Sequence, residues 1–326
     1  MKEKERVRTR FATPAAAALA FFALAPAAAA QQTDGVFSAG PPLGVTIDGQ
    51  FAPISDNVKV YGGVVNAESC SYHPGLDLIM VVNRGVNQDQ VPNDAFVSLL
   101  NHDGTVHTPH WIGATRAGLV LNHPLGSHTW NNRLYVADRD GGTNDQDPSI
   151  SVIRWFSLET GAPMGEIRIE DSPGFNDIEV AEDGTIYATD TGNSRLYRIG
   201  QDGTWRVLVD GGALNRPNGV AIDNDGNIVV VNAGDAGVIT LSPTGAVLNT
   251  EQAAQPGSDG IVIMPDGTKY VSSVREGGVS RIRPGQPAEL IARNIPSAAS
   301  MCYDAGANQL VIPLNPNNAV AIVPLD

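Results

Sequence analysis

Basic residues, aromatic residues and cysteines are all scarce in this chain of 326 residues. Lysine and arginine number 21 against 35 aspartate and glutamate residues, which gives a formal net charge of −14 at pH 7. Such an acidic protein repels phosphate backbones and anionic membrane surfaces, which argues against nucleic-acid binding, although it can attract divalent cations. Aromatic residues contribute only 6% and charged residues 17%, while 42% of the chain is hydrophobic. The chain can therefore bury a full core and is not a disordered polymer.

Long hydrophobic runs are also missing, because no segment reaches the ~20 apolar residues that a membrane span requires. The nearest candidate, residues 15–25, follows a basic stretch at 2–10 and precedes Pro26 and the small-residue tract 27–30. This order is typical of a secretory signal peptide with A-x-A cleavage. We therefore predict a signal peptide at 1–30 and a periplasmic or secreted protein without a membrane span. A transmembrane anchor is the alternative.

The two cysteines, Cys70 and Cys302, do not belong to a CxxC motif, which excludes a redox or zinc site of that type. In an oxidising compartment a disulfide between them would close a very long loop. Two buried free thiols are the alternative.

Glycine and proline, in contrast, are abundant, with 35 and 22 residues. A chain so rich in turn formers favours many short strands over a helical bundle. One pattern, a turn followed by a short apolar strand, recurs six times, starting at Ile79, Leu134, Ile186, Ile228, Lys269 and Leu310. These starts are 55, 52, 42, 41 and 41 residues apart. In a β-rich chain, a period in this range indicates propeller blades.

Each unit divides into four strands, which in the fourth unit are 220–223, 228–232, 237–241 and 246–248. Asp-Gly pairs at 183–184, 225–226, 266–267, 103–104 and 202–203 predict tight two-residue turns. The last unit supplies only three strands, and the otherwise unpartnered segment 58–65 should complete it and close the ring. We therefore predict an all-β, six-bladed β-propeller of four-stranded blades over 56–326, preceded by an aperiodic N-terminal arm at 31–55. A Cys70–Cys302 disulfide would join the first and sixth blades.

The innermost strand of each propeller blade begins beside the central channel. The positions just before these strands, which we call the axial slots, are Glu68, Leu125, Asn176, Asn218, Asp259 and Ala299. Four of them carry a side-chain oxygen, and such a set of hard oxygen ligands suits Ca²⁺ or another hard divalent cation. Zinc is a poor fit because the slots hold no His or Cys. Taken singly, Asn218-Gly219 and Asp259-Gly260 are also ordinary turn dipeptides.

Three segments resemble the metal-site segments of the gluconolactonase and regucalcin family of six-bladed propellers: FNDI at 175–178, RPNGV at 216–220 and SDGI at 258–261. Glu68 falls where that family places its N-terminal glutamate ligand. The resemblance implies that Glu68, Asn218 and Asp259 bind calcium and that Asn176 is a ligand or a substrate contact. It also implies hydrolysis of sugar lactones.

Two departures from the family pattern leave the substrate open. Glu68 is followed by Ser-Cys-Ser-Tyr at 69–72 instead of the Gly-Pro that is usual in the family, and segment 123–126 lacks an obvious family substrate residue. Related propellers cleave esters or phosphotriesters with the same metal chemistry, so these reactions remain alternatives.

The predicted protein is a monomer that adds water to a small-molecule cyclic ester, with calcium polarising the carbonyl group. Asp259 is the candidate that orients or deprotonates the water, and His123 is a candidate substrate contact. His123 and His128 are alternative bases. The chain has no Gly-x-Ser-x-Gly elbow, which argues against a serine esterase. The other function classes are a non-catalytic NHL-type propeller that binds a protein or cell-envelope partner, which segment 191–196 also resembles, and a lyase at the same axis.

Overall fold

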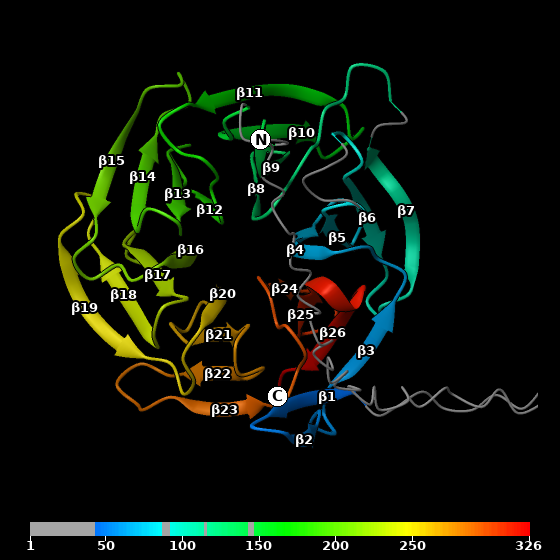
Figure 1. Cartoon of the computed structure of the whole chain (residues 1–326), viewed down its shortest axis with the longest axis vertical. Helices are drawn as coiled ribbons and strands as arrows, with labels where there is room; N and C mark the ends of the chain where they lie inside the picture. Colours follow the sequence, from blue (N-terminus) through cyan, green and yellow to red (C-terminus); the bar gives the residue numbers. More distant parts are fainter. Residues whose placement is uncertain (1–42, 87–91, 114–115, 143–146) are drawn as a thin grey trace, which may run out of the picture. The chain divides into compact units, whose positions relative to one another are not determined.

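Six antiparallel sheets of four strands each surround a common axis in the computed structural model (Figure 1). The structure describes residues 43–86, 92–113, 116–142 and 147–326, so the predicted signal peptide and the first part of the arm lie outside the described residues. The prediction of a six-bladed propeller is confirmed. Within the described ranges, no helix is long and apolar enough to cross a membrane.

Each sheet is one blade, and in the first five blades the strands follow the chain outward from the axis. The first three blades are β4 (Ala67–His73), β5 (Leu78–Asn83), β6 (Phe96–Leu100) and β7 (Val106–Gly113); β8 (Ser127–Trp130), β9 (Arg133–Asp140), β10 (Ile150–Ser157) and β11 (Pro163–Ile169); and β12 (Ile178–Val180), β13 (Ile186–Asp190), β14 (Arg195–Ile199) and β15 (Trp205–Asp210). The fourth and fifth are β16 (Pro217–Ile222), β17 (Ile228–Asn232), β18 (Gly237–Leu241) and β19 (Val247–Gln252); and β20 (Ser258–Ile263), β21 (Lys269–Ser273), β22 (Val279–Ile282) and β23 (Glu289–Ala292). The sixth contains β24 (Cys302–Asp304), β25 (Gln309–Leu314), β26 (Ala319–Pro324) and β3 (Lys59–Gly62).

The hydrophobic core lies between neighbouring blades. The middle strands β5 and β17 are buried along their whole length because a blade covers each of their faces. Met80 and Val82 of the first blade, for example, pack with Leu134 and Val136 of the second. Full burial of each such side chain contributes about 1.5–3 kcal/mol. The outermost strand β19, in contrast, is mostly exposed. The apolar contacts between blades therefore involve mainly the inner strands and hold these around the axis.

The five predicted Asp-Gly pairs all lie in turns between strands, but the turns are of another type than expected. Only the glycine has a positive φ, between 78° and 85°. In the turn around Asp183-Gly184, the N–H of Gly184 donates to the carbonyl of Ala181 at 2.9 Å, and the N–H of Ala181 donates to Thr185. This is the three-residue hairpin with a glycine bulge instead of the two-residue turn. The prediction was therefore right in place and wrong in turn type.

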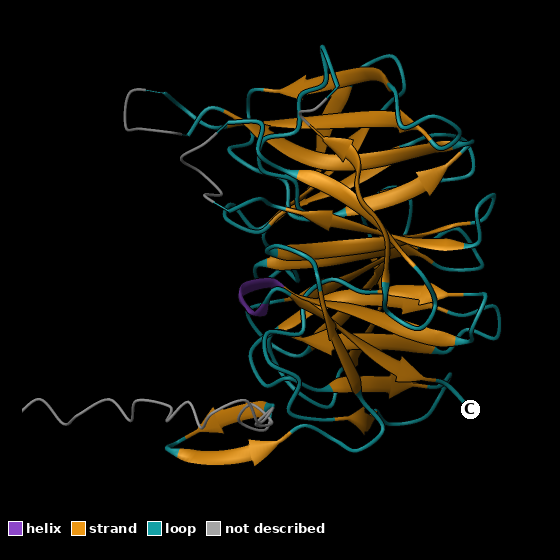
Figure 2. Ribbon diagram, turned by 90° about the vertical axis from the view of Figure 1, so that its right-hand side faces the viewer, coloured by secondary structure: helices purple, strands orange, loops and turns teal. Residues whose placement is uncertain are grey.

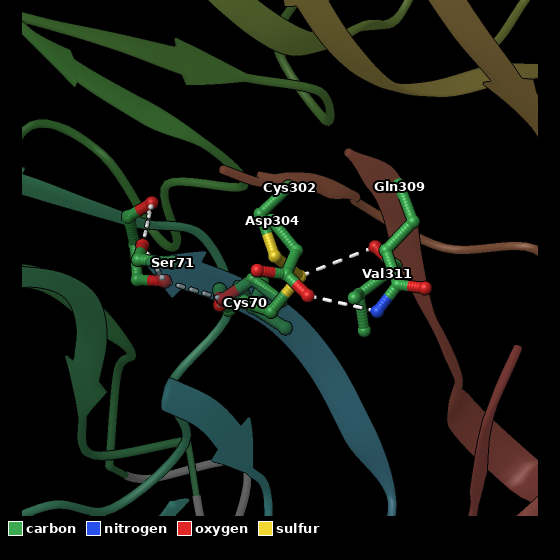
Figure 3. Close-up of a disulfide and its surroundings, with 9 residues drawn as sticks. Cys70, Ser71, Cys302, Asp304, Gln309 and Val311 are labelled. Carbon is green, nitrogen blue, oxygen red and sulfur yellow. Dashed lines mark hydrogen bonds between the residues drawn. A yellow bond between two sulfur atoms is a disulfide. The ribbon is translucent and has the colours of Figure 1, made fainter. Parts of the chain in front are cut away.

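The predicted closure of the ring is found in the sixth sheet, where β3 pairs with β26 in antiparallel register (Figure 1). The Cys70–Cys302 disulfide joins the innermost strands β4 and β24 of the first and last blades, across a sequence separation of 232 residues (Figure 3). Hydrogen bonds at the outer strand and a covalent bond near the axis therefore close the same seam.

A charged network also crosses this seam. His102, in the turn between β6 and β7, lies 2.9 Å from a carboxylate oxygen of Asp304 in β24 and 3.3 Å from one of Asp77. Asp304 is fully buried, and it also accepts a hydrogen bond from Gln309 (Figure 3). Both ring nitrogens of His102 face carboxylates, an arrangement that favours the protonated imidazole, in which both nitrogens donate. Burial lowers the pKa of His102, but Asp304 and Asp77 outweigh burial and raise it.

The predicted aperiodic arm at 31–55 is wrong in its last part, which forms a β-hairpin of β1 (Gly44–Ile47) and β2 (Gln50–Pro53) (Figure 2). The turn residues Asp48 and Gly49 both have positive φ, 48° and 76°, which is the geometry of a two-residue type I′ turn. The residues after the hairpin hydrogen-bond to the chain that follows β23, as in the 3.1 Å bond from the N–H of Ser55 to the carbonyl of Arg293.

Removing the disulfide should destabilise the protein. A Cys70→Ala/Cys302→Ala double variant should lose about 2–5 kcal/mol of unfolding free energy, because the bond restricts the unfolded chain over a very long loop. Urea denaturation without reductant measures the difference, and wild-type protein with reductant should match the variant. Equal midpoints for the oxidised wild type and the variant would contradict the structural role of the bond.

The His102 network should make stability depend on pH. Because the folded-state pKa of His102 is raised, its contribution is fully present below about pH 6.5, the ordinary histidine value, and is lost as pH rises through the raised value. A His102→Gln variant should therefore be less stable than wild type at pH 5.5–6, with a difference that shrinks at higher pH. Urea denaturation across the pH range tests this, and a difference independent of pH would rule out the charge mechanism.

Candidate functional site at the axial slots

Glu68, Asn218 and Asp259 lie in β-bulges near the start of the innermost strands β4, β16 and β20. In each strand the register with the neighbouring middle strand shifts at this point. A bulge leaves a residue out of the regular ladder and redirects its side chain. The orientation of the three side chains is therefore set by a local irregularity that the blades share.

The other three axial slots have the same backbone arrangement. The N–H groups of Leu125, Asn176 and Ala299 each donate to a carbonyl of the adjacent middle strand, at 2.8, 2.8 and 3.1 Å. The sequence alignment therefore identified structurally equivalent positions, with oxygen-bearing side chains in the first, third, fourth and fifth blades.

The glycines that follow Asn218 and Asp259 are needed for close approach between blades. A Cβ atom on Gly219 would lie 2.4 Å from the carbonyl oxygen of Asp259, and one on Gly260 would lie 2.5 Å from the backbone nitrogen of Met301. Neither glycine has a positive φ. The interpretation of these dipeptides as ordinary turns is therefore wrong, because each lies within an innermost strand that packs directly against the next blade.

Two side-chain oxygens at the slots are buried without a hydrogen-bond donor. The Nδ2 group of Asn218 donates to Oδ2 of Asp259 at 3.1 Å. Within the described part of the chain, Oδ1 of Asn218 and Oδ1 of Asp259 have no hydrogen-bond partner. Buried acceptors are normally satisfied, so a pair of open oxygens beside each other indicates a site for a ligand that accepts their lone pairs.

Glu68 belongs to the same electrostatic group. Asn315 donates a hydrogen bond to Oε2 of Glu68, and Nη1 of Arg84 lies 3.7 Å from the same oxygen. Burial raises the pKa of Glu68, and Arg84 opposes this effect. The pKa of Asp259 is raised well above its ordinary value, first by burial and then by repulsion from Glu68 and Asp177. The two slot carboxylates therefore repel each other in a poorly solvated place.

The donor set fits calcium. Glu68, Asn218 and Asp259 could hold the ion through carboxylate and amide oxygens, which are the ligands that Ca²⁺ prefers. Its charge would remove the repulsion between the two carboxylates. No group of three His, Cys, Asp or Glu side chains that could hold a metal is found among the described residues, so such a site depends on the amide of Asn218. The half-buried Asn176 side chain makes no hydrogen bond within these ranges and is open to a ligand or substrate.

His123 lies on the opposite side of Arg84 from Glu68. Its Nε2 atom is 2.6 Å from Nη2 of Arg84, and its backbone N–H donates to Asp138 at 2.6 Å. Arginine can only donate, so Nε2 accepts and His123 is neutral with its proton on Nδ1. Arg84 therefore bridges His123 and Glu68. Nε2 of His123, the nitrogen that would accept a proton from substrate or water, is already occupied by Arg84.

His128 does not lie among the slots. It lies three residues after the slot residue Leu125 and lines an axial cavity of about 220 Å³ that all six innermost strands surround. There its Nδ1 atom is 2.8 Å from Glu179 of the next blade. Burial lowers the pKa of His128, but the charge and hydrogen bond of Glu179 together with the charge of Asp177 outweigh burial and raise it. In the same cavity burial raises the pKa of Asp177 to about 7. His128 therefore lies in the axial cavity beyond the slots, whereas His123 lies beside Arg84.

Sequence reasoning missed Arg84 and Asn315. Both occupy what we call the rim positions, two residues beyond the middle-strand residue that faces each axial slot. In blade order these are Arg84, Arg139, Thr191, Ala233, Val274 and Asn315. The repeat alignment that located the slots contains these positions, but their contact with Glu68 crosses between strands and blades.

Comparison with protein-family models finds a match to the SMP-30/Gluconolactonase/LRE-like region over residues 132–312. This segment spans more than half of the chain and includes three of the four oxygen-bearing slots, at Asn176, Asn218 and Asp259. A search of curated proteins finds no match.

Several solved structures share the fold at low sequence identity. A gluconolactonase from Xanthomonas campestris is 18% identical, with 89% of this chain and 99% of that chain covered and a TM-score of 0.56. A catalytically inactive virginiamycin B lyase from Staphylococcus aureus, crystallised with quinupristin, is 12% identical, with coverages of 82% and 100% and a TM-score of 0.58. A protein of unknown function from Bacteroides thetaiotaomicron is 14% identical, with coverages of 87% and 82% and a TM-score of 0.56. At these identities the likeness establishes the fold.

The repulsion at the slots should lower the stability of the metal-free protein. Because the pKa of Asp259 is raised in the folded state, its ionisation destabilises the fold as pH rises above about 4, its ordinary value. In EDTA, an Asp259→Asn variant should therefore unfold at a higher temperature than wild type at pH 7–8, and the two should converge near pH 4. The exposed Asp225→Asn change should have no such effect.

Calcium should reverse that ranking. At one hundred times its dissociation constant, a ligand stabilises the folded state by about 2.7 kcal/mol, and the variant lacks one candidate carboxylate ligand. Thermal unfolding of wild type and Asp259→Asn, with calcium and with EDTA, measures both rankings. A wild type that is more stable than Asp259→Asn in EDTA would contradict the electrostatic account of the slots.

Proposed function

Because the chain belongs to the SMP-30/gluconolactonase/LRE-like family, we propose that it is an exported, calcium-dependent hydrolase of sugar lactones or related cyclic esters. The observation that carries the proposal is the pair of open, buried oxygens on Asn218 and Asp259 beside the Glu68 carboxylate. A non-catalytic propeller has no use for two mutually repelling buried carboxylates, which destabilise the folded state. Their presence at equivalent slots on the axis supports a functional cation site.

A bound calcium ion would supply Lewis acidity at the carbonyl oxygen of the lactone. The chain supplies the remaining functions. Asn176, whose side chain is open, contacts the ring substituents of the substrate. The carboxylate of Asp259, which Asn218 holds through Oδ2, accepts a hydrogen bond from the attacking water and orients it. The reaction consumes one water, breaks the bond between the acyl carbon and the ring oxygen, and yields a hydroxy acid that releases one proton at neutral pH.

Export is supported by two features of the chain. Residues 1–30 have the pattern of a secretory signal peptide, and the Cys70–Cys302 disulfide is of the kind that forms in oxidising compartments. We accordingly propose a periplasmic or secreted location.

The proposal is tested first by metal content. Elemental analysis of the desalted mature protein should find about one calcium per chain, and an Asp259→Ala variant should lose it, while the matched exposed variant Asp225→Ala keeps it. Proton release from a panel of sugar lactones should then be abolished by EDTA, restored by calcium, and reduced by about a hundredfold or more in Asp259→Ala. Simple esters and phosphotriesters complete the panel.

Two outcomes would overturn the proposal. A protein that binds no calcium and hydrolyses no lactone or ester would be a binding scaffold. A product that contains a new double bond and incorporates no oxygen from labelled water would show a lyase. Mass spectrometry in ¹⁸O-water separates hydrolysis from elimination, because only hydrolysis adds the label to the acid.

A further inference from the structure

Arg84 lies at the candidate site with most of its hydrogen-bonding capacity unused. It follows directly after β5 in the first blade, and its side chain is 16% exposed. Nη2 donates to His123, whereas Nη1 lies 3.7 Å from Glu68, beyond hydrogen-bond distance. The Nε atom is buried and, within the described ranges, has no acceptor. A guanidinium group has five N–H donors, so this arginine is under-satisfied where it stands.

The neighbours of Arg84 do not neutralise its charge when a cation is bound. His123 accepts from Arg84 and is therefore uncharged. Glu68 is the carboxylate beside Arg84, and it is also a candidate metal ligand. Glu68, Asp259 and Arg84 sum to −1, so a divalent cation would bring these three groups to +1, before the charge of Asp177 is counted. Asp177, deeper along the axis, is held by the backbone N–H groups of Ile178 and Val220.

The repeat explains why the positive charge lies on one side. Among the rim positions, the sixth, first and second blades carry Asn315, Arg84 and Arg139, whereas the third, fourth and fifth carry Thr191, Ala233 and Val274. Amide and guanidinium side chains therefore occupy the rim positions of three consecutive blades. Asn176, Asn218 and Asp259, whose oxygens are open, belong to the three blades opposite. A substrate bound between them would meet acceptors on one side and cationic donors on the other.

We propose that Arg84 binds an anionic group of the substrate, so that this protein acts on lactones or cyclic esters that carry a carboxylate. Arg84 recognises the carboxylate by charge-assisted hydrogen bonds from the part of its guanidinium group that remains exposed. The rest of the protein is strongly acidic, with a net charge of −14, so a local cationic site selects for an anion that the remaining surface repels. This specificity rests on the proposed hydrolase function, but the anion site itself can be tested without turnover.

The test compares two substrates that differ in one group: a γ-lactone with a ring carboxylate, and the same lactone with a hydroxymethyl group in its place. In wild type the carboxylated lactone should have the higher kcat/KM. An Arg84→Gln variant should lose about 10–100-fold in kcat/KM for it, the range for a lost charge-assisted hydrogen bond, with a change of less than about threefold for the neutral lactone. Arg84→Lys, which keeps the charge without the fork, should fall between them.

Binding is measured separately by calorimetry with tetrahydrofuroate, a ring ether acid that cannot be hydrolysed. It should bind the calcium-loaded wild type at least tenfold more tightly than the Arg84→Gln variant, and more tightly than tetrahydrofurfuryl alcohol, which lacks the charge. The control variant Arg206→Gln, at an exposed residue of the outer strand β15, should bind like wild type. Equal calcium content of wild type and Arg84→Gln shows that the loss does not arise from the metal.

The outcomes separate this inference from the proposed function. Hydrolysis of both lactones with an equal loss for both in Arg84→Gln would overturn the anion site and leave the hydrolase standing. Binding of tetrahydrofuroate that depends on Arg84, without hydrolysis of any lactone, would support the anion site and refute the hydrolase. If the Arg84 variants do not fold, equal wild-type affinities for tetrahydrofuroate and tetrahydrofurfuryl alcohol would still overturn the inference.

Discussion

Closure of the ring at the seam between the first and last blades determines whether the candidate site exists. Glu68 comes from the first blade and Asn315, which holds its carboxylate, from the last, 247 residues apart in sequence. The disulfide, the pairing of β3 with β26 and the His102 network all cross this seam at different depths. Cys70 lies two residues beyond Glu68 in the same strand, so the covalent bond also fixes the strand that presents the glutamate. Opening of the seam would separate Glu68 from its partner.

Close approach around the axis gives the slots their geometry. In several blades a side-chain hydroxyl donates to the slot carbonyl of the next blade: Ser69 to Leu125 at 2.6 Å, Thr189 to Asn218 at 2.5 Å and Ser272 to Ala299 at 2.8 Å. Glycines at 219 and 260 let the strands meet without a side chain between them. The polar slot residues are thus held by neighbours on both sides, and the hydrogen bonds fix the backbone while the side chains stay open.

Much of this was predictable because a propeller repeats one unit. The period located the middle strands, and the alignment of units located the six axial slots. The incomplete last unit predicted the closing strand. The hairpin β1–β2 was missed, although Asp48-Gly49 is the same dipeptide that was used elsewhere as a turn signal. Segment 31–55 has no counterpart in the repeating units, and its lack of periodicity alone led to the prediction of an aperiodic arm. A dipeptide that forms a type I′ turn needs no repeat to support it.

Arg84, His123 and His128 show what a repeat alignment does not contain. Alignment within a blade places residues at a depth along the axis, and the position of His128 beyond the slots follows from counting along β8. Whether two side chains meet depends on the rotation between blades and on rotamers, which the sequence pattern does not specify. The hydrogen bond between Arg84 and His123 is of this kind, since 39 residues and a blade boundary separate them.

The regular outer body of the propeller offsets the destabilisation that the buried charges at the axial slots produce. Two carboxylates without full counter-charge lower the stability of the metal-free fold, and that destabilisation must be offset elsewhere. The middle strands offset it with continuous apolar packing between every pair of neighbouring blades. The repulsion between carboxylates lies at the inner ends of the blades, and the apolar packing lies farther out. A substitution at a rim position can therefore change substrate contacts without disturbing the hydrophobic core. The same separation allows Arg84 to differ chemically from its equivalents Ala233 and Val274 while the blades that carry them keep one architecture.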